Sequence, residues 1–160
     1  MSYIVNDTLT QQAERGEIFY AIAFMGIDVG ATKDVVLDNA SNLSDIAFNL
    51  DIQSPNTLVV KYYGACLNPT GGTSVTVRNL KKTAPLPSTQ TNFITSVTGF
   101  TLPGTIQEFY YALDGNAQKV SPTSLEAPLI LGAGIQYRWE LTNVGSDPVV
   151  GNIGCFFREL

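Results

Sequence analysis

The 160-residue sequence contains no histidine, so it lacks the side chain that most often serves as a general base, a proton shuttle or a zinc ligand. Charged residues make up only 14% of the chain, and the formal net charge of -5 disfavours a nucleic-acid partner. No apolar run reaches the roughly 20 residues that a membrane-spanning helix requires. The first residues also lack the basic region and apolar stretch of a signal peptide. We therefore expect a chain that is not an enzyme, needs no cofactor, and binds neither nucleic acid nor a membrane.

Cysteine is also scarce, because the chain has only 2, Cys66 and Cys155. Both lie inside apolar segments, which predicts buried thiols that act as small hydrophobic side chains. A disulfide between them stays open as an alternative, although the missing secretory signal disfavours it. A redox motif would need closer spacing, and a metal site would need more ligands.

Residues that suit β-sheets and tight turns are abundant. The chain has 16 Thr, 11 Asn and 14 Gly, whereas Ala, Leu, Glu and Lys never gather into a long helical stretch. Thr, Val, Ile, Tyr and Phe fit a pleated surface, and Asn, Gly and Pro fit the connections between strands. The composition predicts an all-β protein whose low surface charge favours association with itself or with a partner.

Alternation of apolar and polar side chains predicts several half-buried strands. The clearest is residues 135–143, in which every second side chain is apolar and faces the predicted core: Ile135, Tyr137, Trp139 and Leu141. The polar side chains between them, Arg138 and Glu140 included, are predicted to face outward. The same period of two recurs in residues 46–53, more weakly in residues 73–80, and again in residues 109–113.

Three further stretches are apolar on both faces: residues 18–27, 58–67 and 149–157. Such a pattern is typical of a strand that is covered on both faces, and a short buried helix would look the same. For residues 18–27 we prefer a strand, because glycines interrupt and bracket the segment.

Turn residues separate these segments at intervals of about ten residues. Predicted turns lie at residues 68–72, 132–134 and 143–148, with a tight hairpin at Asp114 and Gly115 and a long surface loop over residues 81–90. We therefore predict one all-β domain over residues 18–160, an antiparallel β-sandwich of jelly-roll or Greek-key type. Residues 1–17 are predicted to be an N-terminal arm or irregular segment, in which residues 8–15 could form one or two helical turns.

Two groups of side chains were weighed for chemistry. A carboxylate pair could in principle cleave glycosides, and the candidates are Glu108, Asp114, Glu126 and Glu140. Oxygen side chains also gather over eight residues and could bind calcium: Asp38, Asn39, Asn42 and Asp45. Solvated carboxylates explain the first group, and Asx turns explain the second equally well. We therefore predict no catalytic residue and no metal site.

A partner interface is the remaining kind of site that the sequence suggests. No Asp or Glu occurs between Gln53 and Gln107, so the lysine and arginine residues of that segment have no acidic residue near them in the sequence. Strand alternation also sends one ring of each tyrosine pair away from the core. The predicted interface combines these two features: Lys61, Tyr63, Arg78, Lys81, Lys82 and Tyr110. Interleaved strands could instead mix the charges in space.

The C-terminal third and the middle turn resemble a known group of proteins. The run of residues 127–134, the strand of residues 135–143, the turn at 145–147 and the ending Phe156-Phe157-Arg158-Glu159-Leu160 are similar to the last strands of small jelly-roll proteins from tailed-phage particles. Residues 68–72 resemble the Asn-Pro-x-Gly turns of such virion proteins. The resemblance implies a capsid decoration, neck, tail or fibre component, often a trimer, and it implies no catalytic residue.

Taken together, these observations favour a structural virion protein that is made in the host cytoplasm and decorates a capsid lattice. Its expected partners are further copies of itself, with a trimer favoured, and the major capsid protein or another virion protein. The alternative is a β-sandwich that binds a carbohydrate or a receptor, because exposed tyrosines on a sheet can stack against sugars.

Overall fold

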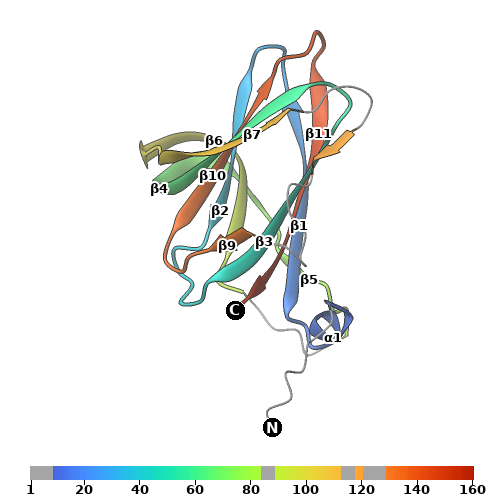
Figure 1. Ribbon diagram of the computed structural model, residues 1–160, viewed down its shortest axis with the longest axis vertical. Helices are drawn as coiled ribbons and strands as arrows, with labels where there is room; N and C mark the ends of the chain where they lie inside the picture. The colour runs from blue at the N-terminus through green and yellow to red at the C-terminus, as the bar shows by residue number, and fades with distance from the viewer. Residues whose placement is uncertain (1–8, 84–88, 113–117, 121–128) are drawn as a thin grey trace.

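The computed structural model describes residues 9–83, 89–112, 118–120 and 129–160. Within these residues one short helix precedes eleven strands (Figure 1). The elements are α1 (Leu9–Glu14), β1 (Ile18–Ile27), β2 (Thr32–Asp38), β3 (Ile46–Ser54), β4 (Leu58–Val75), β5 (Arg78–Asn79), β6 (Asn92–Leu102), β7 (Thr105–Ala112), β8 (Gln118–Val120), β9 (Leu129–Leu131), β10 (Gln136–Asn143) and β11 (Val149–Glu159).

The strands form two antiparallel sheets that pack face to face. Sheet A has the order β5-β1-β11-β3-β8, with β9 also paired to β3, and sheet B has the order β10-β2-β6-β4-β7. The chain passes from one sheet to the other at most of its connections, so strands that are neighbours in a sheet are seldom neighbours in the sequence. This arrangement confirms the predicted β-sandwich of jelly-roll type.

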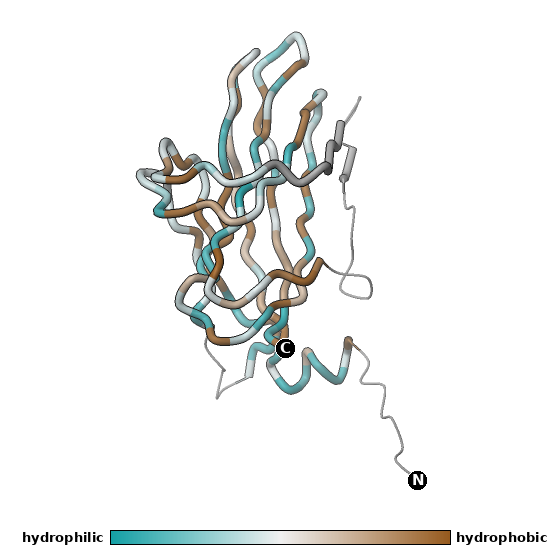
Figure 2. The backbone as a smooth tube through the Cα atoms, turned by 60° about the vertical axis from the view of Figure 1, so that its left-hand side comes forward, coloured by the Kyte–Doolittle hydropathy of each residue, from teal (hydrophilic) through white to brown (hydrophobic). Residues whose placement is uncertain are grey.

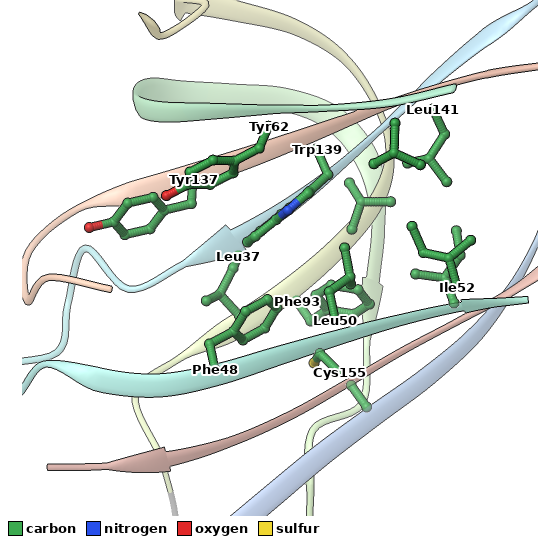
Figure 3. Close-up of a cluster of buried hydrophobic side chains, with 14 of the residues drawn as sticks. Leu37, Phe48, Leu50, Ile52, Tyr62, Phe93, Tyr137, Trp139, Leu141 and Cys155 are labelled. Carbon is green, nitrogen blue, oxygen red and sulfur yellow. The ribbon is translucent and has the colours of Figure 1, made fainter. Parts of the chain in front are cut away.

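Aromatic side chains hold the two sheets together. Figure 3 shows Trp139 of β10 in the core near Phe48 of β3 and Tyr62 of β4. The ring centroid of Trp139 lies 5.0 Å from that of Phe48 and 5.2 Å from that of Tyr62. Tyr137 and Leu141 are buried on the same side of β10, as the alternation predicted. The same alternation is visible as brown and teal segments along the strands in Figure 2.

Residues 68–72 do not form the predicted turn, because β4 runs through them without a break. The pairing of β4 with β6 instead shifts in register between Thr70 and Gly71, and the φ angles of Asn68, Gly71 and Gly72 are 47°, 68° and 82°. An added Cβ at Gly72 would lie 2.8 Å from the carbonyl oxygen of Thr95, so only glycine fits there. The predicted strand over residues 73–80 is likewise split between the end of β4 and the short β5.

The long, bulged β4 closes a ring of strands at one end of sheet B. Its first half pairs with β10 and β7, and its second half pairs with β6, which in turn pairs with β2 beside β10. A second, smaller apolar cluster lies inside this ring, formed by Val36, Cys66 and Val97 with Ile94 and Phe100. The outer face of sheet B is therefore partly covered by its own chain.

This cover corrects the prediction that Arg138 faces solvent. Only 9% of Arg138 is exposed, and its guanidinium lies over the rings of Tyr63 and Phe100, 4.4 and 4.6 Å from their centroids. It donates hydrogen bonds of 2.8 Å to both Asp34 and Glu140. Burial raises the pKa of Asp34, and the hydrogen bond from Arg138 opposes that rise. Alternation placed Arg138 on the correct face, but the extension of β4 and β6 buries that face.

Most of the other local predictions agree with the structure. Cys66 and Cys155 are free and buried. Turns connect β9 to β10 and β10 to β11 at the predicted positions, and α1 lies within the predicted helical segment. The hairpin at Asp114 and Gly115 lies outside the described residues, as does the middle of the loop over residues 81–90.

Replacing Arg138 tests whether the buried charges depend on it. We expect Arg138→Ala to lower the free energy of unfolding by about 3–5 kcal/mol, because two carboxylates then stay buried without their partner. The exposed Arg78→Ala should change it by less than about 0.5 kcal/mol. Urea denaturation followed by circular dichroism measures both values. Adding Asp34→Asn and Glu140→Gln to an Arg138→Met variant should recover part of the loss, and no recovery would contradict this interpretation.

The buried thiols predict a loss of stability at alkaline pH. Burial raises the pKa of Cys155 to about 12 and that of Cys66 to about 11, and it also raises the pKa of Tyr62. The unfolded chain therefore releases these protons at a lower pH than the folded chain does. Above about pH 9 the free energy of unfolding should fall by about 1.4 kcal/mol per pH unit for each thiol.

Urea midpoints measured between about pH 8 and pH 10.5 test this expectation, which rests on raised thiol pKa values. Cys155→Ala should be less stable at pH 8 but should lose stability less steeply as the pH rises. Equal slopes for the two proteins would show that Cys155 does not cause the effect.

Candidate interaction surfaces

Large apolar side chains are exposed on the outer face of sheet A, along β1 and β11. Ile22 is 49% exposed and Phe24 is 76% exposed on β1, and Val150 is 63% exposed on the neighbouring β11. Tyr20 and Phe156 continue the surface toward the other end of these strands, where their rings stack with centroids 6.0 Å apart. We call these five residues the apolar face.

The apolar face corrects one prediction about residues 18–27. That segment is the predicted strand, but it is covered on one face only: Phe19, Ala21 and Met25 are buried in the core, whereas Ile22 and Phe24 are exposed. A strand with apolar side chains on both faces has the same sequence pattern whether or not a second layer covers its outer face. The exposed apolar residues were therefore missed as site residues, although their pattern was visible in the sequence.

Small and polar residues border the apolar face. Gly154 of β11 lies opposite Ile22 in the sheet register, and both line a hollow of about 230 Å³. Asp51, Gln53 and Asn152 line the far side of this hollow. An apolar centre with a polar rim is the usual composition of a surface that contacts another protein.

Three of the six predicted interface residues gather at the β5 edge of sheet A. Arg78 lies in β5, and Lys81 and Lys82 follow after Leu80. The ammonium group of Lys82 donates a 2.7 Å hydrogen bond to the Tyr20 hydroxyl, and this bond lowers the pKa of that hydroxyl. The Lys82 nitrogen also lies 4.5 Å from the centroid of the Tyr20 ring. A basic edge therefore adjoins the apolar face.

The other three predicted interface residues belong to sheet B. Lys61 forms a 3.8 Å ion pair with Glu140, and Tyr63 lies against the guanidinium of Arg138. Tyr110 is opposite Lys61 in the register of β4 and β7, but its side chain lies outside the described part. The structure therefore divides the predicted interface between two sheets.

The oxygen side chains considered for calcium are engaged in the loop that connects β2 to β3. The amide of Asn39 donates to the carbonyls of Ser44 and Gly132, and its oxygen accepts a 2.7 Å bond from Thr91. The amide of Asn42 donates to Thr91 and Glu159. Asp38 and Asp45 accept bonds from backbone N–H groups. Among the described residues, no group of three or more acidic or cysteine side chains is placed to hold a metal ion.

A cleft of about 800 Å³ lies beside the basic edge, and Phe19, Val75 and Val77 form its apolar part. Its polar lining includes Arg78 and Lys82, and no carboxylate is among the described residues around it. Of the four carboxylates weighed for catalysis, Glu140 is bound to Arg138. The side chains of the other three, Glu108, Asp114 and Glu126, lie outside the described part.

No protein family matches the sequence, and no curated protein matches it. No helix in the described residues is both long and apolar enough to cross a membrane. Among solved structures, the chain is similar to VP1 of Merkel cell polyomavirus, solved as an unassembled pentamer, with 9% identity over 88% of this chain and 76% of that one and a TM-score of 0.18. It is also similar to a mutant VP2 protein of infectious bursal disease virus in derived T=1 particles, with 10% identity over 89% of this chain and 40% of that one and a TM-score of 0.18. Both are viral proteins, and neither likeness is strong enough to show a family.

Proposed function

We propose that this chain is a non-enzymatic structural subunit of a virus particle, a decoration protein that assembles with itself and binds the capsid lattice of a tailed phage. The apolar face carries the proposal. Ile22 and Phe24 expose large apolar side chains two residues apart on β1, and Val150 of the paired β11 lies diagonally from Phe24, opposite Gly26. Contiguous apolar surface of this kind marks a contact site when it occurs on a folded protein.

The charges around the apolar face suit contact with a protein surface. The face itself carries no charged side chain; Arg78 and Lys82 of the basic edge lie on one side of it, and Asp51 of β3 borders its other side. An apolar centre supplies binding energy, while charges at its margin orient the partner and set the rate of association. A partner surface with acidic side chains next to an apolar patch would fit this arrangement.

A repeating lattice strengthens such contacts without further chemistry. Each copy needs to bind only weakly, because copies that are joined to one another bind the lattice together. The resemblance to small jelly-roll virion proteins favours a trimer as the joined form. The low charge of the chain, 14% of residues, is consistent with a protein that works within an assembly.

Co-sedimentation with phage particles that lack this chain tests the proposal. The wild-type chain should pellet with the particles, and Phe24→Asp should reduce the bound fraction by about tenfold or more, because it places a charge at the centre of the apolar face. Leu43→Asp is the matched control: Leu43 is 98% exposed on the loop between β2 and β3, away from the face.

Circular dichroism and thermal melting should show that both variants are folded. Equal binding of the Phe24→Asp and wild-type chains would exclude the apolar face as the contact surface. Failure of the wild-type chain to pellet with any particle would exclude the decoration role.

A further inference from the structure

One edge of sheet A is open along most of its length. On one side, β1 pairs with β11 over all ten of its residues, from Ile18 to Ile27. On the other side, β5 pairs only with Phe19 and Tyr20. Among the described residues, no strand pairs with this second side over residues 21–27.

The direction of the backbone groups follows from one hydrogen bond. The N–H of Leu80, just after β5, donates to the carbonyl of Ile18 at 2.9 Å, so the backbone groups of Ile18 point toward the β5 side. This direction alternates along a strand, and in an antiparallel pair a residue's N–H and C=O point to the same side. The N–H and C=O groups of Ile22, Phe24 and Gly26 therefore point to the open edge.

Over residues 21–27 this edge lacks three of the usual protections against pairing. Natural proteins protect an edge strand with lysines, prolines or bulges. The segment from Ile18 to Ile27 has no charged residue and no proline, and none of its φ angles is positive. An uncharged, apolar and regular edge is a template for another strand.

We propose that β1 pairs with β1 of a second copy, antiparallel and about a two-fold axis at Phe24. The inference rests on the proposed function, names a second copy as the partner of this edge, and replaces the trimer favoured by the resemblance with a two-fold pair. Phe24 then lies opposite Phe24 of the other copy, and Ile22 lies opposite Gly26. The three outward-pointing residues of each copy exchange backbone hydrogen bonds in this register.

The ends of the open edge select this register. β5 occupies the position beside Tyr20, and Val75 and Thr76, which lead into β5, line one hollow with Tyr20 and Ile22, so a second strand can pair only beyond Tyr20. β1 ends at Ile27, where the chain turns toward β2. Phe24 is the midpoint of residues 21–27, so a two-fold axis there pairs every open residue of both copies. A shift by one residue would place the apolar side chains on the wrong face.

Side chains complement one another in this register. An ideal Cβ at Gly26 meets nothing within 4 Å, so the space beside it can take Ile22 of the second copy. Pairing would also cover the side of Phe24 that faces the open edge, while the outer side of this ring, which is 76% exposed in one copy, stays open.

Charges match at each end of the paired strands. The exposed Asp28 follows Ile27 directly, and in the pair it approaches Arg78 of the other copy, which lies beside Tyr20. A hollow of about 350 Å³ at this place is lined by Tyr20, Ile22, Thr76 and Arg78 together with Val75. The two-fold axis forms this contact twice.

The pairing would place both apolar faces on the same side of one continuous sheet. The two-fold axis of an antiparallel strand pair is perpendicular to the sheet, so it does not turn the outer face of one copy away from that of the other. The combined face would present Ile22, Phe24 and Val150 of both copies to a capsid.

A proline at Gly26 tests the hydrogen bonds of the edge. Gly26→Pro removes an N–H that points to the open edge and leaves the bonds to β11 in place, and proline is tolerated on such an edge. Gly26→Ala retains the N–H and is the control. We expect the wild-type and Gly26→Ala chains to sediment with twice the mass of one chain, and we expect Gly26→Pro to weaken the association by about tenfold or more.

Charge exchange at Phe24 tests the register and does not depend on the proline variant. Phe24→Lys alone and Phe24→Glu alone place like charges next to each other across the axis, so each should be monomeric. An equal mixture of the two should form a mixed dimer, because opposite charges then face each other. Failure of the mixture to associate, with both variants folded, would overturn the self-opposed register.

The outcomes separate this inference from the decoration role. A wild-type chain that is monomeric at high concentration, or a trimer that Gly26→Pro leaves unchanged, would overturn the strand pairing even if the chain still binds particles. A wild-type dimer that Gly26→Pro dissociates would support the pairing even if the dimer binds no particle.

Discussion

The contact of Trp139 with Phe48 is the interaction on which the rest of the structure depends, because it joins the two sheets at the centre of the core. Side chains alternate along a strand, so burying Trp139 sends Arg138 to the opposite face of sheet B. A guanidinium there requires carboxylate partners once the face is covered, and Asp34 and Glu140 from β2 and β10 provide them. One packing contact thus determines where the principal buried charges lie.

The two outer faces of the sandwich differ in how far the chain covers them. The face of sheet B that carries Arg138 and its carboxylates is covered by the extension of β4 and β6, whereas the face of sheet A that carries Ile22 and Phe24 is open. Exposed faces of antiparallel sheets are usually polar. Apolar groups on an open face are typical of a surface that contacts another protein. This contrast is the strongest physical reason to place the function on sheet A.

Local pattern predicted the strands well, but it could not predict what covers them. The alternation in β10 and β3 identified Trp139 and Phe48 as core residues, because a period of two is a property of a single segment. The sequence predicts a turn at the bulges of β4, since glycine and asparagine suit both structures. The exposure of Phe24 depends on which distant strands reach sheet A. For the same reason the sequence could not predict that Lys61 and Arg78 lie in different sheets, because the sheet to which a strand belongs depends on long-range pairing.

The arrangement at the ends of β1 also limits how far the chain can assemble. An uncharged, apolar edge strand would ordinarily promote fibres, since each added strand exposes a new edge. Here β5 blocks one end of the edge, and Asp28 and the turn to β2 close the other, so only a short window is open. A two-fold pair uses that window on both copies and leaves no equivalent edge for a third. In the assembled protein, β1 can therefore pair with a second copy without promoting aggregation.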